Sequence, residues 1–246
     1  AYFEATDTAV AASVTLHRRF GTTSTIASLV SDHHDVLVAQ VRALADHVES
    51  GELLGIHLEG PWLSPHRCGA HEPSALRDPD PAEVSALLEA GRGPIRIVTP
   101  APELPGATEA IRRIVDGGAV AAIGHTEATY EQARAAIDAG ATVATHLFNA
   151  MRPVHHREPG PVVAALEDPR VTVELVTDGV HLHPALHRLV TTDVGPDRVA
   201  LVTDAMAAAG MQDGSYRLGS LAVDVVDQIA RVAGTDTIAG STATML

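Results

Sequence analysis

The sequence predicts an α/β fold, a (β/α)8 TIM-type barrel whose first strand is absent from this chain, with part of a small β-sandwich domain at the C-terminal end. Short β-branched or apolar runs alternate with Ala/Leu-rich segments of helical period, and the alternation repeats seven times. After residue 204 the pattern changes to short strands separated by turn residues. Because repeated β and α segments favour a parallel sheet with right-handed crossovers, seven units indicate an eight-stranded barrel that lacks one strand.

The expected elements follow one another in a regular order. The chain opens with a helical segment at residues 5–20. Seven strands are predicted, at residues 23–30, 54–59, 95–100, 120–125, 142–148, 171–177 and 199–204. Helices are predicted between them, at residues 33–49, 81–90, 107–116, 130–139 and 184–191. Several strands are apolar on both faces, as expected where helices cover one side and a barrel interior lies on the other.

The end of the chain does not read as another βα unit. Short alternating strands are expected at residues 216–218, 221–226 and 229–232. We therefore expect two parts: a catalytic barrel domain over residues 1–210, and the start of a small β-domain with the return to the barrel over residues 211–246.

Charge and composition narrow the class of protein. The formal net charge is −14, and a strongly acidic surface repels phosphate backbones, so we expect no nucleic-acid partner. No apolar stretch reaches the ~20 residues needed to cross a bilayer, and no leader pattern opens the chain, so we expect no membrane partner. The single cysteine, Cys68, cannot form an internal disulfide, which fits a reducing compartment. The expected location is the cytoplasm.

All 17 basic residues are arginine, so the chain contains no lysine. Schiff-base chemistry, a carboxylated lysine between two metals and a Walker-type phosphate loop are therefore excluded. The 14 histidines direct attention instead to imidazole and carboxylate chemistry.

Polar residues gather where the predicted strands end. In a (β/α)-barrel the loops at the C-terminal strand ends converge on one mouth, which is where reactive groups lie. Five of the expected strands end in, or are followed by, such residues: Glu59, His125, His146, the pair Asp178 and His181, and Asp204.

Three of these residues suit a metal ion. One carboxylate, Glu59, and two imidazoles, His125 and His146, form a site for a divalent cation such as Zn²⁺ or Fe²⁺, with a position left for water. Water in such a site can ionise near neutral pH, which supplies a hydroxide nucleophile. Asp204 could then take up a proton and deliver it to a leaving nitrogen as a general acid–base. Spacing alone does not identify the substrate.

Seven motifs in order resemble the N-acetylglucosamine-6-phosphate deacetylase family of the amidohydrolase superfamily. The resemblance covers essentially the whole chain. The motifs are HLEGPWL (57–63), GAH (69–71), GHT (124–126), THLFNAM (145–151), REPG (157–160), DGVH (178–181) and TDA (203–205). The resemblance implies hydrolysis of the acetamide of N-acetylglucosamine-6-phosphate to glucosamine-6-phosphate and acetate, in amino-sugar catabolism and cell-wall recycling.

The resemblance also implies roles for the site residues. Glu59, His125 and His146 match the family's metal ligands, and Asp204 matches its catalytic acid–base. His71 matches a residue that hydrogen-bonds the substrate and polarises the acetyl carbonyl. The expected cofactor is a divalent metal ion, with Zn²⁺ favoured over Fe²⁺, Mn²⁺ and Co²⁺, at one or two ions per subunit.

By the same resemblance, phosphate is bound by Arg157 and His181 with help from the backbone around Asn149 and Ala150. The arginine comes across a subunit interface, so a homodimer that binds a small sugar phosphate is implied. The adjacent His155, His156 and His183 are interpreted as surface residues, and no acid–base motif flanks Cys68.

One departure from the family and two alternative functions stay open. The family has a first strand that can carry a His-x-His pair, whereas the nearest string here, DHHD at residues 32–35, begins a helix and lacks that spacing. A different metal-dependent amidohydrolase, for example one acting on a cyclic amide, would keep the metal site without the phosphate pocket. A non-catalytic sugar-phosphate binding barrel would keep the fold without the chemistry.

Overall fold

The computed structural model describes residues 2–245, and its main feature is a curled parallel β-sheet. Within these residues seven strands lie in the sequential order β1 to β7. The strands are Ile26–Val30 (β1), Gly55–Glu59 (β2), Ile95–Thr99 (β3), Val120–Ile123 (β4), Ala141–Ala144 (β5), Thr172–Val176 (β6) and Val199–Val202 (β7). Every pairing between neighbours is parallel, as the predicted βα repeat requires.

The sheet is a barrel that does not close. Among the described residues, β1 and β7 are the two edges of the sheet and do not pair with each other. The curvature and strand order fit a partial TIM-type barrel, which confirms the predicted fold class.

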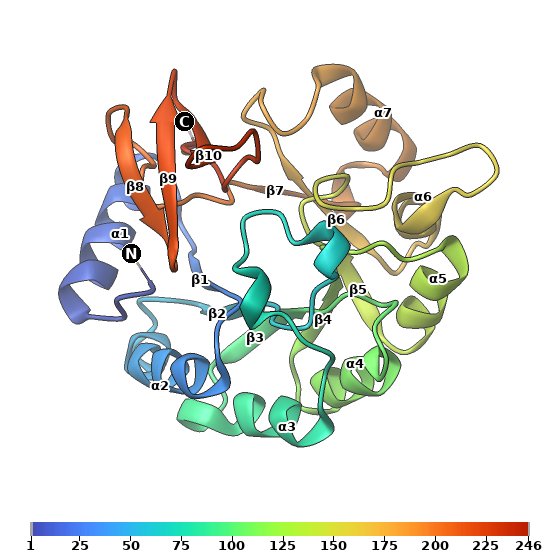
Figure 1. Ribbon diagram of the computed structural model, residues 1–246, viewed down its shortest axis with the longest axis horizontal. Helices are drawn as coiled ribbons and strands as arrows, with labels where there is room; N and C mark the ends of the chain where they lie inside the picture. The colour runs from blue at the N-terminus through green and yellow to red at the C-terminus, as the bar shows by residue number, and fades with distance from the viewer. Residues whose placement is uncertain (1, 246) are drawn as a thin grey trace.

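Helices form a ring outside the sheet (Figure 1). The α-helices are Asp7–Arg19 (α1), His34–Glu49 (α2), Pro81–Glu89 (α3), Ala107–Asp116 (α4), Tyr130–Asp138 (α5), Gly160–Glu167 (α6) and Pro184–Val194 (α7). Short 3₁₀ helices lie at Pro65–Arg67, Pro73–Ala75, Ala90–Arg92 and Pro196–Arg198. No helix in residues 2–245 is long and apolar enough to cross a membrane.

Alternation along β2 explains how the strands serve both the core and the site. Ile56 and Leu58 are fully buried and belong to the main hydrophobic core. Successive side chains of a strand point to opposite faces, so His57 and Glu59 face the other way, into the barrel. Thus one five-residue strand contributes both apolar packing and a reactive carboxylate.

A small antiparallel sheet lies beside the open edge of the barrel, above α1 in Figure 1. It contains Gly214–Leu218 (β8), Leu221–Val226 (β9) and Ile229–Val232 (β10), in the order β10–β9–β8. A second apolar cluster joins it to loops at the barrel mouth through Ala70, Met206 and Ala208. The division of the chain at residue 210 stays a prediction.

All seven predicted barrel strands are longer than the observed ones, and for two of them the backbone shows why. The predictions at residues 120–125 and 142–148 correspond to β4 and β5, which end at Ile123 and Ala144. The chain leaves the extended conformation there because His125 and His146 adopt positive φ angles of 46° and 29°. The predicted set of helices also did not include α6, whose mostly Ala and Val sequence after a Gly-Pro start shows little helical amphipathicity.

Candidate active site

A cavity of about 830 Å³ opens at the C-terminal ends of the barrel strands. Most of the predicted site residues line it, although they come from five different strand ends. They are Glu59, His71, His125, His146, Asn149, Ala150, His181 and Asp204.

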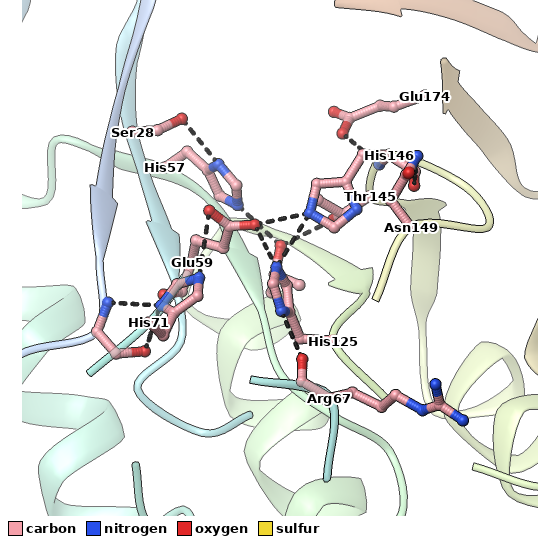
Figure 2. A network of polar contacts seen from close by, with 12 residues as sticks. Ser28, His57, Glu59, Arg67, His71, His125, Thr145, His146, Asn149 and Glu174 are labelled. Carbon is pink, nitrogen blue, oxygen red and sulfur yellow. Dashed lines mark hydrogen bonds and ion pairs between the residues drawn. The ribbon is translucent and has the colours of Figure 1, made fainter. Parts of the chain in front are cut away.

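Three buried donor atoms meet at the base of this cavity (Figure 2). Glu59 Oε1 lies 2.9 Å from His125 Nε2 and 2.8 Å from His146 Nε2, and the two imidazole nitrogens are 3.1 Å apart. Ligands bonded at ~2.0–2.2 Å to one tetrahedral ion lie about 3.3–3.5 Å from each other, so a small outward shift would admit a cation. The donor set therefore fits a divalent metal ion.

The hydrogen bond on the far side of His125 prepares it as a ligand. His125 Nδ1 lies 2.8 Å from the carbonyl oxygen of Arg67. A carbonyl oxygen only accepts, so Nδ1 carries the proton and donates it. In the neutral ring Nε2 then holds a free lone pair aimed at Glu59 and His146, the arrangement that fixes a metal-binding tautomer.

His71 has the opposite arrangement. With Glu59 and His125 it forms a second group whose donor atoms lie within 4.8 Å of one another, so distance alone makes it a rival to His146. However, the backbone N–H of Ser31 donates to His71 Nδ1 at 3.1 Å. The neutral ring must then carry its proton on Nε2, 3.6 Å from Glu59 Oε2. This geometry favours His71 as a hydrogen-bond donor to substrate and leaves Glu59, His125 and His146 as the better ligand set.

Burial and close charges set the ionisation of the cluster. Burial alone would raise the pKa of Glu59, but the imidazoles of His125, His146 and His71 around the carboxylate hold that pKa well below its usual range. Burial also works against a charged His146, yet the hydrogen bond and charge of Glu59 raise the pKa of His146 to about 9. Glu59 and His146 therefore stabilise each other's charged forms.

Asp204 is a partly buried carboxyl that lines the same cavity. Burial, and next the negative charge of Glu59, raise the pKa of Asp204 to about 6. A carboxyl that titrates near neutral pH can both accept and return a proton, which is the requirement for a general acid–base.

Three of the site residues adopt a backbone conformation that side chains other than glycine rarely occupy. The φ angles of His125, His146 and Asp204 are 46°, 29° and 47°. Each residue follows the end of a strand, at β4, β5 and β7. Backbone strain of this kind clusters at functional sites because the surrounding fold over-determines it.

The loop after β6 holds a histidine at the rim of the cavity. Asp178 Oδ1 accepts the backbone N–H groups of Val180 and His181, each at 2.9 Å, and Asp178 Oδ2 lies 2.7 Å from His181 Nδ1. The turn fixes the ring so that Nε2 is its free nitrogen. The side-chain amide of Asn149 donates to the carbonyl of His146 at 3.2 Å, which anchors the loop after β5.

Arg157 is the one predicted site residue that lies away from the cavity lining in the described chain. It is exposed on the loop between β5 and α6, and its guanidinium lies 2.7 Å from His156 Nε2. A single chain therefore does not bring this arginine to the site.

The structure adds a partly buried carboxyl that the strand-end pattern did not indicate. Glu174 on β6 accepts the backbone N–H of His146 at 3.4 Å, and burial raises its pKa to about 7. One charged residue within the apolar run of residues 171–176 was an available signal that β6 presents a polar group to the barrel interior.

A barrel whose strand ends hold a buried carboxylate, two imidazoles and a titratable aspartate has the arrangement typical of metal-assisted hydrolases. The sequence profile of the amidohydrolase family matches residues 4–246, and the chain belongs to that family.

Individual relatives are more specific and confirm the resemblance. N-acetylglucosamine-6-phosphate deacetylase of Bacillus subtilis (strain 168) is 39% identical over 228 residues, which cover 90% of this chain and 57% of the relative. N-acetylgalactosamine-6-phosphate deacetylase of Escherichia coli O157:H7 is 39% identical over 228 residues, covering 91% of this chain and 60% of the relative.

A solved structure is closer still. In Mycobacterium smegmatis an aspartate-to-alanine variant of N-acetyl-D-glucosamine-6-phosphate deacetylase, in complex with N-acetyl-D-glucosamine-6-phosphate, is 61% identical with a TM-score of 0.98. The match covers 99% of this chain and 64% of that one. The chain thus spans about 60% of the length of the curated relatives it matches.

Proposed function

We propose that this chain is the barrel portion of a metal-dependent N-acetylglucosamine-6-phosphate deacetylase. The reaction hydrolyses the acetamide to glucosamine-6-phosphate and acetate, a step of amino-sugar catabolism and cell-wall recycling. The observation that carries the proposal is the meeting of Glu59, His125 and His146 within 2.8–3.1 Å beside Asp204. The similarity to deacetylases of this substrate supports it.

Glu59 Oε1, His125 Nε2 and His146 Nε2 would hold the metal ion. A carboxylate and two imidazoles suit Zn²⁺ best, while Fe²⁺, Mn²⁺ and Co²⁺ also accept such ligands. When bound, a divalent cation lowers the pKa of water and polarises a carbonyl oxygen. This site accounts for one ion per subunit, and a second ion remains part of the proposal.

Two residues would act on the amide itself. The Nε2–H of His71 donates to the acetyl oxygen and stabilises the negative charge that develops there as water adds, an effect worth roughly 2.7–4 kcal/mol for one such donor. Asp204 takes a proton from the attacking water and delivers it to the amino nitrogen as the C–N bond breaks. These two functions need opposite sides of the substrate, as their separate strand ends allow.

The phosphate would be bound by imidazole, backbone and guanidinium groups, since the chain has no lysine. His181, Asn149 and Ala150 line the cavity from the same chain. We assign the remaining cation to Arg157 of a second subunit, because this residue lies outside the cavity of its own chain. A homodimer follows from this assignment, and the cytoplasm is the proposed location.

Acetate release from N-acetylglucosamine-6-phosphate tests the proposed reaction. The protein is assayed as purified, after chelation, and after add-back of Zn²⁺, Fe²⁺, Mn²⁺ or Co²⁺. We expect activity to fall on chelation and to return with at least one of these ions. Turnover that survives complete chelation would contradict the proposal. N-acetylgalactosamine-6-phosphate serves as the comparison substrate, since one relative bears that name.

Phosphate recognition separates this function from its two rivals. Arg157→Ala should raise KM for the phosphorylated sugar far more than for N-acetylglucosamine. Equal changes for both sugars would favour another amidohydrolase, such as one acting on a cyclic amide. Sugar-phosphate binding without any acetate release, in metal-loaded protein, would favour the non-catalytic binding barrel.

A further inference from the structure

A chain of hydrogen bonds crosses the barrel interior next to the metal-site residues. Ser28 Oγ lies 3.0 Å from His57 Nδ1, His57 Nε2 lies 2.8 Å from Thr99 Oγ1, and Thr99 Oγ1 lies 2.8 Å from Thr145 Oγ1. The chain runs from β1 through β2 and β3 to the end of β5. We call these four residues the polar floor; Figure 2 shows its Ser28–His57 pair, which in that view lies above Glu59 and to the left of His146.

The last link of the polar floor depends on a glycine. β3 and β5 are not neighbours in the sheet, because β4 lies between them. The Thr99–Thr145 bond therefore passes in front of Gly124, where an added Cβ would lie 2.7 Å from Thr99 Cγ2 and 3.0 Å from Thr145 Cβ. Only glycine at this position lets the two hydroxyls meet.

Each floor position is next to a metal-site residue in the sequence. His57 lies two residues before Glu59 on the same face of β2, Gly124 directly precedes His125, and Thr145 directly precedes His146. In register, Thr99 lies opposite Glu59. The floor thus joins the backbone that carries Glu59 to the backbone that carries His146.

A floor of this composition is not needed to fill the barrel. Branched apolar side chains usually occupy such layers, and a buried polar network costs desolvation that a well-packed apolar layer avoids. A polar layer has one advantage over an apolar layer. Hydrogen bonds are directional, so each of them fixes the separation of the two strands that it joins. Ligand positions must be held to within about 0.5 Å for a productive metal site.

We propose that the polar floor of Ser28, His57, Thr99 and Thr145 positions Glu59 and His146 at the separation that a divalent cation requires. His57 and Thr99 are the central positioning residues, since each joins two partners. The inference rests on the metal site of the proposed function and adds to it a determinant of metal affinity.

The test is the dissociation constant for Zn²⁺, measured on metal-free protein by competition with a chromophoric chelator. Thr99→Val keeps the shape of the side chain but removes the hydroxyl that bonds both His57 and Thr145. We expect Zn²⁺ binding to weaken 10–100-fold, the usual effect of losing a partner behind a ligand. Thr99→Ser restores the hydroxyl and should bind Zn²⁺ within about threefold of the unaltered chain. Rescue by serine separates positioning from packing, because serine also removes a buried methyl group.

Thr142→Val is the matched control, since Thr142 is exposed on β5 three residues before Thr145. It should leave Zn²⁺ affinity unchanged. If Thr99→Val folds and binds Zn²⁺ as tightly as the unaltered chain, the positioning role is wrong even though the metal site stands. If Thr99→Val does not fold, Thr145→Val, which removes only the final bond, is measured by the same criterion. Failure of the unaltered chain to bind Zn²⁺ would overturn the proposed function as well.

Discussion

At the scale of single residues, the fixed chemistry of backbone groups distinguishes histidines that look alike. His71, His125 and His146 are all buried beside Glu59. A backbone N–H bonds His71, whereas a backbone carbonyl bonds His125, so the two rings carry their protons on opposite nitrogens. Among the described residues, His146 Nδ1 has no hydrogen-bond partner, which leaves Nε2 as its only engaged nitrogen. The tautomers divide the cluster into one donor and two ligands.

This division predicts different results for two identical substitutions. His146→Asn should lower bound Zn²⁺ well below one ion per chain, since it removes a ligand from the metal site. His71→Asn should keep the full zinc content and lower kcat for acetate release by about 10²–10³-fold, the usual loss for one oxyanion donor. Zinc is measured by elemental analysis of the dialysed proteins. Loss of zinc in His71→Asn with retention in His146→Asn would reverse the assignment.

Asp204 gives a second prediction at this scale. Asp204→Asn keeps the size of the side chain but cannot take up a proton, so acetate release should stop. Zinc content and the affinity for an unreactive substrate analogue should change by less than about threefold, because the carboxylate is not one of the three proposed ligands. Calorimetric titration with the analogue measures the second quantity. Retained turnover would exclude the acid–base role.

At the scale of elements, one buried carboxylate joins three consecutive parts of the barrel. Asp168 ends α6 and is 3% exposed. It accepts Arg134 of α5 at 2.7 Å, and Arg170, just before β6, at 2.7 and 2.9 Å. The hydrogen bonds of Arg170, and then the charges of both arginines, hold the pKa of Asp168 far below its ordinary value. The carboxylate therefore stabilises the α5–α6–β6 unit only while it is ionised.

Asp168→Asn should lower the melting temperature by about 4–8 °C at neutral pH, as expected when a buried acceptor of charged hydrogen bonds is lost. A depressed pKa contributes stability above the unfolded value near 3.9, and that stability is lost as pH falls through the folded value. The difference between variant and unaltered chain should thus be constant from pH 5 to 8 and shrink below about pH 4. Thermal melts across this range measure it.

Asp138→Asn is the control for Asp168→Asn. Asp138 also binds Arg170, but it is exposed, and its loss should cost less than about 2 °C. An equal effect of the two substitutions would show that burial of Asp168 does not matter.

The sequence predicted the elements well because strands and helices leave periodic patterns. Helix 107–116 and strands 221–226 and 229–232 have the predicted bounds, and the other predicted helices and strands differ at their ends by a few residues. The strand ends at Ile123 and Ala144 were missed because the left-handed turn of the following histidine has no signature in residue type. Helix α6 was missed because a buried Ala/Val helix lacks a polar face.

Part of the site was also predictable, because the predicted strands show where their C-terminal ends lie. Strand-end position indicated Glu59, His125, His146 and Asp204, which the structure brings to one cavity. The partners that set each tautomer, the backbone groups of Ser31 and Arg67, could not be found this way, since every residue has them. Contacts between distant segments appear only in the folded chain.

At the scale of the whole molecule, the sheet of the barrel is open and Arg157 lies away from the cavity within the described residues. β1 and β7 are unpaired edges within residues 2–245, and Leu201 on β7 is 54% exposed. Arg157 and its neighbours lie on a loop that extends outward between β5 and α6. The homodimer proposed above requires a twofold partner to place a copy of that loop against each cavity.

Mixing two variants with different defects, assayed at a substrate concentration far below the raised KM of Arg157→Ala, tests this arrangement. Arg157→Ala lacks the donated guanidinium, and Asp204→Asn lacks the acid–base of its own cavity. In a mixed dimer the Arg157→Ala subunit keeps Asp204 and receives Arg157 from its partner, so one of the two sites is intact. Random exchange makes half of the dimers mixed, so activity should return to about a quarter of that of the unaltered protein. Activity that stays at the level of the separate variants would show that each cavity uses its own arginine.

The left-handed backbone at His125, His146 and Asp204 has a consequence for engineering this protein. Glycine occupies that conformation without the penalty of roughly 1–3 kcal/mol that other residues carry. A library of variants selected only for thermal stability would therefore be enriched in glycine at the three positions. Such variants would be more stable but would lack the side chains of the proposed active site. Selection for thermal stability therefore has to be combined with selection for catalytic activity, because the backbone conformation of the site residues lowers the stability of the fold.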